Sequence, residues 1–230
     1  MSEPASNERE LSLSDRDRSA FRGVIWVGGI VMSITFAYAI TRYVIFGPIS
    51  AENIPLYVLN KSLAWGSLLL LALAMSLGSL GRLWPNRIAR HVWHRKYIGL
   101  LGFFIATLHI CLSCFIMGFG YYRSFFLATI KMSFLVELSM LFGLVSWFLL
   151  FFLAVTSFPS VENNMSRRYW LRFHHWGVYA VVLGSLHVIY GYATWTTPGD
   201  WYGYMPPITL WSFAIMFVML LVRFLGRSKD

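Results

Sequence analysis

The chain has 230 residues, of which 57% are hydrophobic, 18% aromatic and only 13% charged, with a mean hydropathy of +0.60. This composition is far from that of a water-soluble domain, so it predicts an integral membrane protein. The formal net charge of +9 would suit nucleic acid or acidic lipid, but the basic residues fall in the predicted loops. We therefore expect membrane lipid, and no nucleic acid, among the partners.

The chain begins with a polar segment, residues 1–22, which mixes both charge signs and predicts a mobile tail or a short interfacial helix. Six apolar runs follow, each near or above the length of a membrane-crossing helix, at about 23–45, 62–80, 97–117, 132–157, 168–193 and 206–225. The sequence thus predicts an all-α integral membrane protein. We expect a six-transmembrane-helix bundle over 23–225, between tails at 1–22 and 226–230.

Lys and Arg are unevenly divided between the two sides of this arrangement. The N-terminal tail holds four basic residues, and the connection after the second run holds five. The connection after the fourth run and the C-terminus each hold three. The opposite loops hold three, namely Lys61, Arg123 and Lys131. Because basic loops remain in the cytoplasm, both termini are predicted to be cytoplasmic, in a multi-pass protein of a bacterial inner membrane.

Histidines inside the apolar runs are the candidate functional residues, since an imidazole within a bilayer is unfavourable unless something binds it. His109 in the third run and His187 in the fifth each lie about fourteen residues from the basic side, so parallel helices place them at about the same depth. Two such imidazoles suit the axial positions of one b-type haem. Hydrogen bonding across helices or a proton relay is the alternative.

His174 lies thirteen residues before His187, about 20 Å along a helix and near the cytoplasmic face. It is a candidate ligand of a second, inner haem, with His94 as its partner, or part of an FMN or quinone site. An ideal helix leaves His174 and His187 about 140° apart, so two stacked haems require an irregularity in this run. The adjacent His175 competes for the inner position.

Three motifs resemble the ferric-reductase-like transmembrane superfamily: R-K-Y-I-G-L at 95–100 with T-L-H at 107–109, L-A-V-T-S at 153–157, and R-x-W-L-R-F-H-x12-H at 168–187. The resemblance covers about residues 60–225. The superfamily includes NADPH oxidases, metalloreductases and the MsrQ-type haem-binding membrane subunit of the methionine sulfoxide reductase system.

Two differences from the oxidases point toward the MsrQ type. Arg95 stands where the oxidases and ferric reductases carry a second histidine, and no flavin or nicotinamide domain is expected after the sixth run. One difference points the other way, because His175 stands where MsrQ subunits carry arginine.

The resemblance implies the electron-transfer membrane subunit of an oxidoreductase system, with one or two b-type haems bound through His109, His187 and His174, and with His94 as a further candidate. The implied partners are a cytoplasmic flavoprotein donor and a periplasmic or membrane acceptor protein. Two alternatives stay open. They are a quinone-reactive cytochrome b subunit of a respiratory complex, and a non-redox membrane scaffold or transporter.

The charge asymmetry generates a topology prediction. A reporter fused after Asp230 should be active only if it works in the cytoplasm, because the basic side of the chain includes the C-terminus. Paired alkaline phosphatase and fluorescent-protein fusions measure this directly. Phosphatase activity at this position would contradict both the orientation and the matched depths of the histidines.

Overall fold

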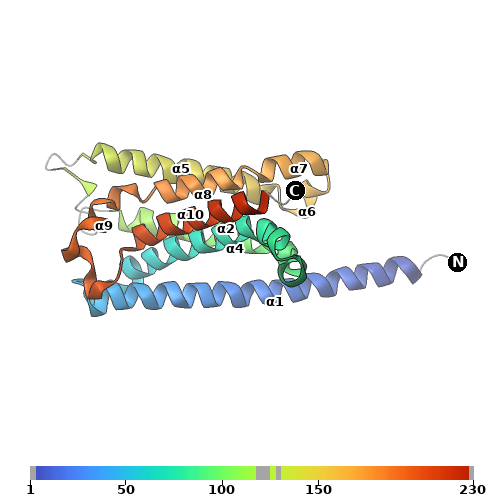
Figure 1. Ribbon diagram of the computed structural model, residues 1–230, viewed down its shortest axis with the longest axis horizontal. Helices are drawn as coiled ribbons and strands as arrows, with labels where there is room; N and C mark the ends of the chain where they lie inside the picture. Colours follow the sequence, from blue (N-terminus) through green and yellow to red (C-terminus); the bar gives the residue numbers. More distant parts are fainter. Residues whose placement is uncertain (1–3, 118–124, 128–130, 228–230) are drawn as a thin grey trace.

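The computed structural model describes residues 4–117, 125–127 and 131–227, with side chains from residue 21 onward. Long helices lie side by side along one axis (Figure 1): α1 Pro4–Ile40, α2 Leu59–Leu83, α4 Arg95–Ile116, α5 Phe134–Val155, α8 Gly177–Leu186 and α10 Ile208–Arg227. The described residues form no strand, only an isolated bridge between Phe126 and Met132. The predicted all-α fold is confirmed.

Short helical segments connect the long helices: η1 Thr41–Ile45, η2 Ala51–Asn53, η3 Ile54–Val58, α3 Pro85–Ile88, η4 Ala89–His94, α6 Pro159–Glu162, α7 Arg167–His174, η6 Ile189–Gly191, α9 Ala193–Thr196, η7 Pro198–Asp200 and η8 Tyr202–Tyr204. Proline begins several of them because its fixed φ suits a first helical turn. Before Pro85, Trp84 leaves the helical region at φ −128° and ψ 70°, and this ends α2.

Five segments are long and apolar enough to cross a membrane: Phe21–Ile45, Ala51–Leu83, Pro85–Ile116, Phe134–Val155 and Tyr202–Arg227. Their outward side chains are strongly apolar, and Phe115, Phe134 and Phe224 are 88%, 78% and 71% exposed. Such a surface is stable only against lipid. The chain is therefore a multi-pass membrane protein, as predicted, whereas its assignment to a bacterial inner membrane stays a prediction.

The segment predicted as the fifth crossing, 168–193, is interrupted rather than continuous. α7 ends at His174 and α8 begins at Gly177. Between them the backbone makes shorter-range hydrogen bonds, Trp176 N to Phe173 O at 3.0 Å and Val178 N to His175 O at 3.2 Å. A turn of this kind holds fewer residues than an α-helical turn, so it changes the angle between His174 and the residues of α8. The irregularity lies between His174 and His187.

The chain ends differ from the predicted tails in one respect. α1 begins at Pro4, so the backbone of most of the predicted 1–22 tail is helical and continuous with the first crossing. Arg123 of the predicted outer loop and residues 228–230 of the predicted C-terminal tail lie outside the described residues. The division into 1–22, 23–225 and 226–230 stays a prediction.

The start of α1 and the end of α10 lie toward the same end of the bundle as α7 (Figure 1). We call this the inner end and the opposite end, where α9 lies, the outer end. α7 and α8 together run from the inner end toward the outer end, so the interrupted segment crosses the bundle like its neighbours.

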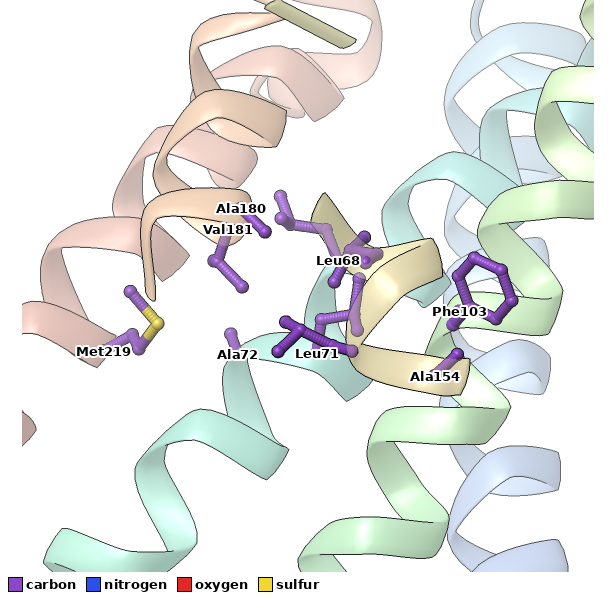
Figure 2. Close-up of a cluster of buried hydrophobic side chains, with 10 residues drawn as sticks. Leu68, Leu71, Ala72, Phe103, Ala154, Ala180, Val181 and Met219 are labelled. Carbon is purple, nitrogen blue, oxygen red and sulfur yellow. The ribbon is translucent and has the colours of Figure 1, made fainter. Parts of the chain in front are cut away.

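An apolar cluster to which five helices contribute holds the middle of the bundle together: Leu68, Leu71, Ala72, Phe103, Leu150, Leu153, Ala154, Ala180, Val181 and Met219. Figure 2 shows Leu68 and Leu71 between Val181 on one side and Phe103 on the other. Alanines in this cluster allow close approach of the helices, which is how helices associate inside a bilayer. We call these residues the central cluster.

Arg42, which is 2% exposed, joins the end of α1 to the connection before α10. Its Nε donates to the Pro206 carbonyl at 2.9 Å and its Nη2 donates to the Asp200 carbonyl. The guanidinium also lies 4.8 Å from the ring centroid of Tyr43 and 4.9 Å from that of Tyr202. A buried charge is stable only when it is hydrogen-bonded, so these contacts fix the outer connection against α1.

Replacing Arg42 with Gln should therefore lower the free energy of unfolding by about 2–4 kcal/mol, because hydrogen bonds from a charged buried donor are lost. Thermal unfolding in detergent measures the change. Arg22→Gln, at an exposed position on the same membrane-crossing segment, is the matched control. Equal melting temperatures for the two variants would contradict the role of Arg42.

Candidate cofactor site

A cavity of about 470 Å³ lies within the bundle, in the size range of sites that bind small molecules and cofactors. Both His109 and His187 line it. Several members of the central cluster also line it, including Leu71 and Val181, so the cluster forms the floor of the cavity toward the inner end. The structure brings together the two imidazoles that the sequence analysis paired.

The His109 ring is held by α2. Its Nδ1 lies 2.7 Å from Oδ1 of Asn60, and the amide Nδ2 of Asn60 donates to Ser113 Oγ at 2.9 Å. Because the amide donor of Asn60 is used toward Ser113, its oxygen faces the imidazole and accepts from Nδ1–H. In the neutral ring, the Nε2 atom of His109 therefore keeps its lone pair.

The His187 ring is held by α5. Its Nδ1 lies 2.8 Å from the carbonyl oxygen of Ser139, which can only accept a hydrogen bond, so Nδ1 carries a proton. In the neutral ring, Nε2 then keeps its lone pair. In return, Ser139 Oγ donates to the carbonyl oxygen of His187. This carbonyl follows the last residue of α8, where intrahelical acceptors lose their partners. The reciprocal bonds fix both the ring and the end of the helix.

Small residues of α5 leave room for the His187 ring. A Cβ atom on Gly143 would lie 2.6 Å from His187 Nδ1 and 3.0 Å from Cγ and Cε1, so a side chain there would collide with the imidazole. One turn further along α5, Ser146 Oγ donates to the Ala180 carbonyl at 2.7 Å. A Cβ atom on Gly184 would lie 3.2 Å from the same hydroxyl oxygen. The backbones of α5 and α8 thus approach closely beside the cavity.

The structure corrects the position predicted for Lys61, which lies in α2 and lines the cavity rather than belonging to an outer loop. The error arose because polar residues lower the hydropathy before residue 62 and hide the first turn of the helix. A signal was present, since Asn60, Ala64 and Ser67 follow helical spacing and form a polar and small-residue face. All three line the cavity.

His174 and His175 differ in environment. His174 is half-buried at the end of α7, and its ring centroid lies 3.8 Å from that of Trp170. Within the described part of the chain, its Nε2 is buried and has no hydrogen-bond partner. His175 is exposed, with Nδ1 2.7 Å from the Leu171 carbonyl oxygen. Of the two neighbours, His174 is the one whose ring faces the protein interior.

His94, predicted as the partner of His174, lies in a different environment. Its Nδ1 is 3.2 Å from the His91 carbonyl oxygen, and its ring packs against those of His91 and Trp93. A Cβ atom on Gly23 would lie 3.6 Å from its Nε2, so the ring faces α1.

Positive charge surrounds His174 at the inner end. The charges of Arg95, Lys96 and Glu162 all act on its ring, and Lys96 is ion-paired with Glu162. A Cβ atom on Gly78 would lie 3.3 Å from Arg95 Nη1, which places this guanidinium against α2. Arg223 donates to the Met75 carbonyl of the same helix at 2.9 Å. The basic side chains of Arg95, Lys96 and Arg223 favour an anionic ligand at the inner end.

The fold and the cavity define the class of protein. It is an all-α membrane protein in which histidines from two different helical segments line one internal cavity. The family model for the ferric reductase like transmembrane component matches residues 62–185. The chain therefore belongs to the ferric-reductase-like transmembrane family. The matched range contains His109 and His174 and ends two residues before His187.

Mammalian metalloreductases are among the similar proteins. The chain is 28% identical over 243 aligned residues to metalloreductase STEAP2 from Homo sapiens and from Mus musculus, which covers 88% of this chain and 48% of each relative. Metalloreductase STEAP3 from Rattus norvegicus is 26% identical over 199 residues, covering 76% and 40%. The chain spans about half the length of these relatives or less. The predicted superfamily is confirmed, and the closer likeness to MsrQ stays a prediction.

The geometry at Gly143 generates a prediction that does not depend on any cofactor. Gly143→Ala should lower the free energy of unfolding by about 1–3 kcal/mol, because the added methyl group collides with the His187 ring. Thermal unfolding of the purified variant measures this. Gly29→Ala is the control, since a Cβ atom there meets nothing within 4 Å. A Gly143→Ala variant as stable as the control would contradict the packing of His187 on α5.

Proposed function

We propose that the chain is a transmembrane electron carrier that binds a b-type haem between His109 and His187. The observation that carries this proposal is that both imidazoles line one cavity and each holds its Nδ1 on an oxygen acceptor. A histidine that ligates a metal commonly donates its other ring nitrogen in this way. Both Nε2 atoms are then available as axial ligands.

The residues around the cavity fit a haem in three respects. The apolar lining supplied by residues such as Leu68 and Leu150 suits a porphyrin ring, and the volume of about 470 Å³ suits a cofactor. Two imidazoles are sufficient, because the porphyrin supplies the remaining ligands of the iron. Within the described residues, no group of three or more His, Cys, Asp or Glu side chains could hold a bare metal ion.

Each part of the chain has a role in electron transfer. Haem iron takes up and releases an electron without changing its position, which suits a carrier between two sides of a membrane. Asn60 and Ser139 fix the two ligand rings, so their orientation is preserved in both oxidation states. The central cluster excludes water between the cavity and the inner end.

At the inner end, we propose a donor-side cofactor rather than a second haem. His174 has an unpartnered Nε2 within the described residues, whereas the His94 ring packs against those of His91 and Trp93. The guanidinium groups of Arg95 and Arg223 favour a ligand that carries phosphate. FMN meets this requirement, and an uncharged quinone does not.

The partners and the orientation follow from the same proposal. The basic loops favour a cytoplasmic inner end, where a flavoprotein would deliver electrons, and an acceptor on the opposite side of the membrane. The relatives are named metalloreductases, which supports an acceptor that contains or binds a metal. Periplasmic reductases remain the acceptor class that the likeness to MsrQ implies.

Substitution of the two histidines tests the proposal. His109→Ala and His187→Ala should each lose nearly all of the Soret absorbance of the purified protein, because one imidazole cannot supply both axial ligands. The variants should still insert, since hydropathy sets the membrane spans. Pyridine haemochrome assay and absorbance spectroscopy measure haem per protein.

His91→Ala is the matched control, because His91 is exposed and its ring accepts a hydrogen bond from Arg90 Nε at 3.0 Å. Full haem content in both cavity variants would refute the ligand assignment. A wild-type protein without any reducible absorbance band would favour the scaffold or transporter alternative. Rapid oxidation of the reduced protein by a quinone would favour the respiratory cytochrome b alternative.

A further inference from the structure

The connection between α2 and α4 is strongly basic and lies at the inner end. Residues 82–96 include four arginines, one lysine and two histidines, and no acidic residue occurs between Glu52 and Glu137. Arg82 Nε donates to the Gly226 carbonyl at 3.0 Å, which ties the end of α2 to the end of α10. The connection therefore concentrates positive charge at the inner end of the bundle.

The helical segments α3 and η4 of this connection have one face on the bundle and another that is exposed. Ile88 packs against an apolar cluster that includes Val24 of α1 and Ile98 of α4. Arg87 and Arg90, in contrast, are exposed. They lie three residues apart in consecutive helical turns, so their side chains leave the same face. Two guanidinium groups can therefore reach one ligand.

The exposed face of the connection adjoins α1. Arg90 Nε donates to His91 Nε2 at 3.0 Å, and the ring centroids of His91 and His94 lie 5.6 Å apart. A Cβ atom on Gly23 would in turn lie 3.6 Å from His94 Nε2. Gly23 is close to the start of the first membrane-crossing segment, Phe21–Ile45. The basic groups thus meet α1 at the point where this helix enters the membrane.

An apolar strip of α1 continues from this junction toward the outer end. Trp26 is 73% exposed and Ile30 is 55% exposed. They follow Gly23 by three and seven residues, so the three positions share one side of the helix. A Cβ atom on Gly29, beside them, would meet nothing within 4 Å. The strip is open over about two helical turns, so a hydrocarbon chain can lie along it.

The basic groups and the apolar strip together define the chemistry of one amphipathic ligand. Arginine binds phosphate oxygens through charge-assisted hydrogen bonds that are often bidentate, and basic groups at a membrane surface attract anionic lipids. Within the described residues, Lys96 is the member of this connection that is paired with a carboxylate, that of Glu162. A free phosphate would contact the arginines and leave the strip of α1 uncovered, whereas a phospholipid would contact both.

We propose that Arg87 and Arg90 bind the phosphate group of an anionic phospholipid in the leaflet at the inner end, with an acyl chain of the lipid on Trp26 and Ile30. The site does not depend on what fills the cavity between the central histidines. A lipid bound here contacts both α1 and the connection from α2 to α4. It therefore stabilises the packing of the first crossing against the rest of the bundle.

Lipids that differ only in headgroup test the site in the unaltered protein. The delipidated protein in detergent is titrated with phosphatidylglycerol or phosphatidylcholine of the same acyl chains, and native mass spectrometry counts the bound lipid. We expect phosphatidylglycerol to bind at least about 5-fold more tightly, and the preference to fall as the ionic strength rises. Equal affinities for the two lipids at low ionic strength would overturn the proposal.

The soluble headgroup distinguishes a lipid site from a site for free phosphate esters. Glycerophosphoglycerol carries the same phosphate as phosphatidylglycerol but has no acyl chains to lie on α1. It should not displace the lipid at equal concentration, because burial of the acyl chains supplies part of the affinity. Displacement at equal concentration would overturn the assignment to a lipid.

Substitutions assign the preference to the two arginines. Arg87→Gln and Arg90→Gln should each weaken the binding of phosphatidylglycerol about 5-fold, and the double variant should weaken it about 30-fold. The double variant Arg167→Gln/Arg168→Gln is the matched control, because it removes the same charge from exposed positions on α7. Equal losses in the two double variants would show that only the overall charge attracts the lipid, and would overturn the site.

Thermal unfolding supplies a second readout. Phosphatidylglycerol should raise the melting temperature of the wild type and of the α7 control, because a ligand that binds the folded state stabilises it. It should raise that of Arg87→Gln/Arg90→Gln much less. Without lipid, this variant should melt close to the wild type, since both side chains are exposed. An equal increase in all three proteins would contradict the proposal.

Discussion

The two hydrogen bonds from His109 Nδ1 to Asn60 and from His187 Nδ1 to Ser139 determine how the centre of this protein is built. Inside a bilayer no water can satisfy an imidazole, so each ring must find its partner on a neighbouring helix. In each ring, Nδ1 donates to an oxygen of the neighbouring helix, so Nε2 is the nitrogen that is available to a ligand in the cavity. The close contact of α5 with α8, the glycine at position 143 and the polar start of α2 all serve this arrangement.

The central cluster separates two polar regions with different chemistry. On its outer side lies a mostly apolar cavity with two neutral imidazoles and a lysine. On its inner side lie His174 and several basic groups, among them Arg95 and Arg223. An apolar layer between two polar sites prevents water and ions from crossing, while it does not prevent the passage of an electron. This division suits a family of transmembrane reductases better than it suits a transporter, which requires a polar path.

The sequence predicted the helical class, the membrane environment and the pairing of His109 with His187, because hydropathy and helical rise are local properties of the chain. The sequence analysis placed Lys61 in a loop. Polar residues that face the cavity lower the mean hydropathy of the first turn of α2, so this turn does not stand out as part of a membrane span. The sequence also offered His94 as a partner of His174, and this pairing stays a prediction; a Cβ atom on Gly23 of α1 would lie 3.6 Å from the Nε2 of His94. Two stacked haems would require an irregularity between His174 and His187, and the structure has such a break between His174 and Gly177.

The sequence by itself thus determined that this chain enters a membrane as a helical bundle, and at what depths its histidines lie, since both follow from apolar length and residue count along one axis. Only the tertiary structure decided which ring nitrogen is free, which residues of α2 reach the cavity and which face of the connection from α2 to α4 is exposed. These properties depend on the rotation of each helix about its own axis and on contacts between distant segments. Rotation is fixed by packing against neighbours, which no single stretch of sequence contains.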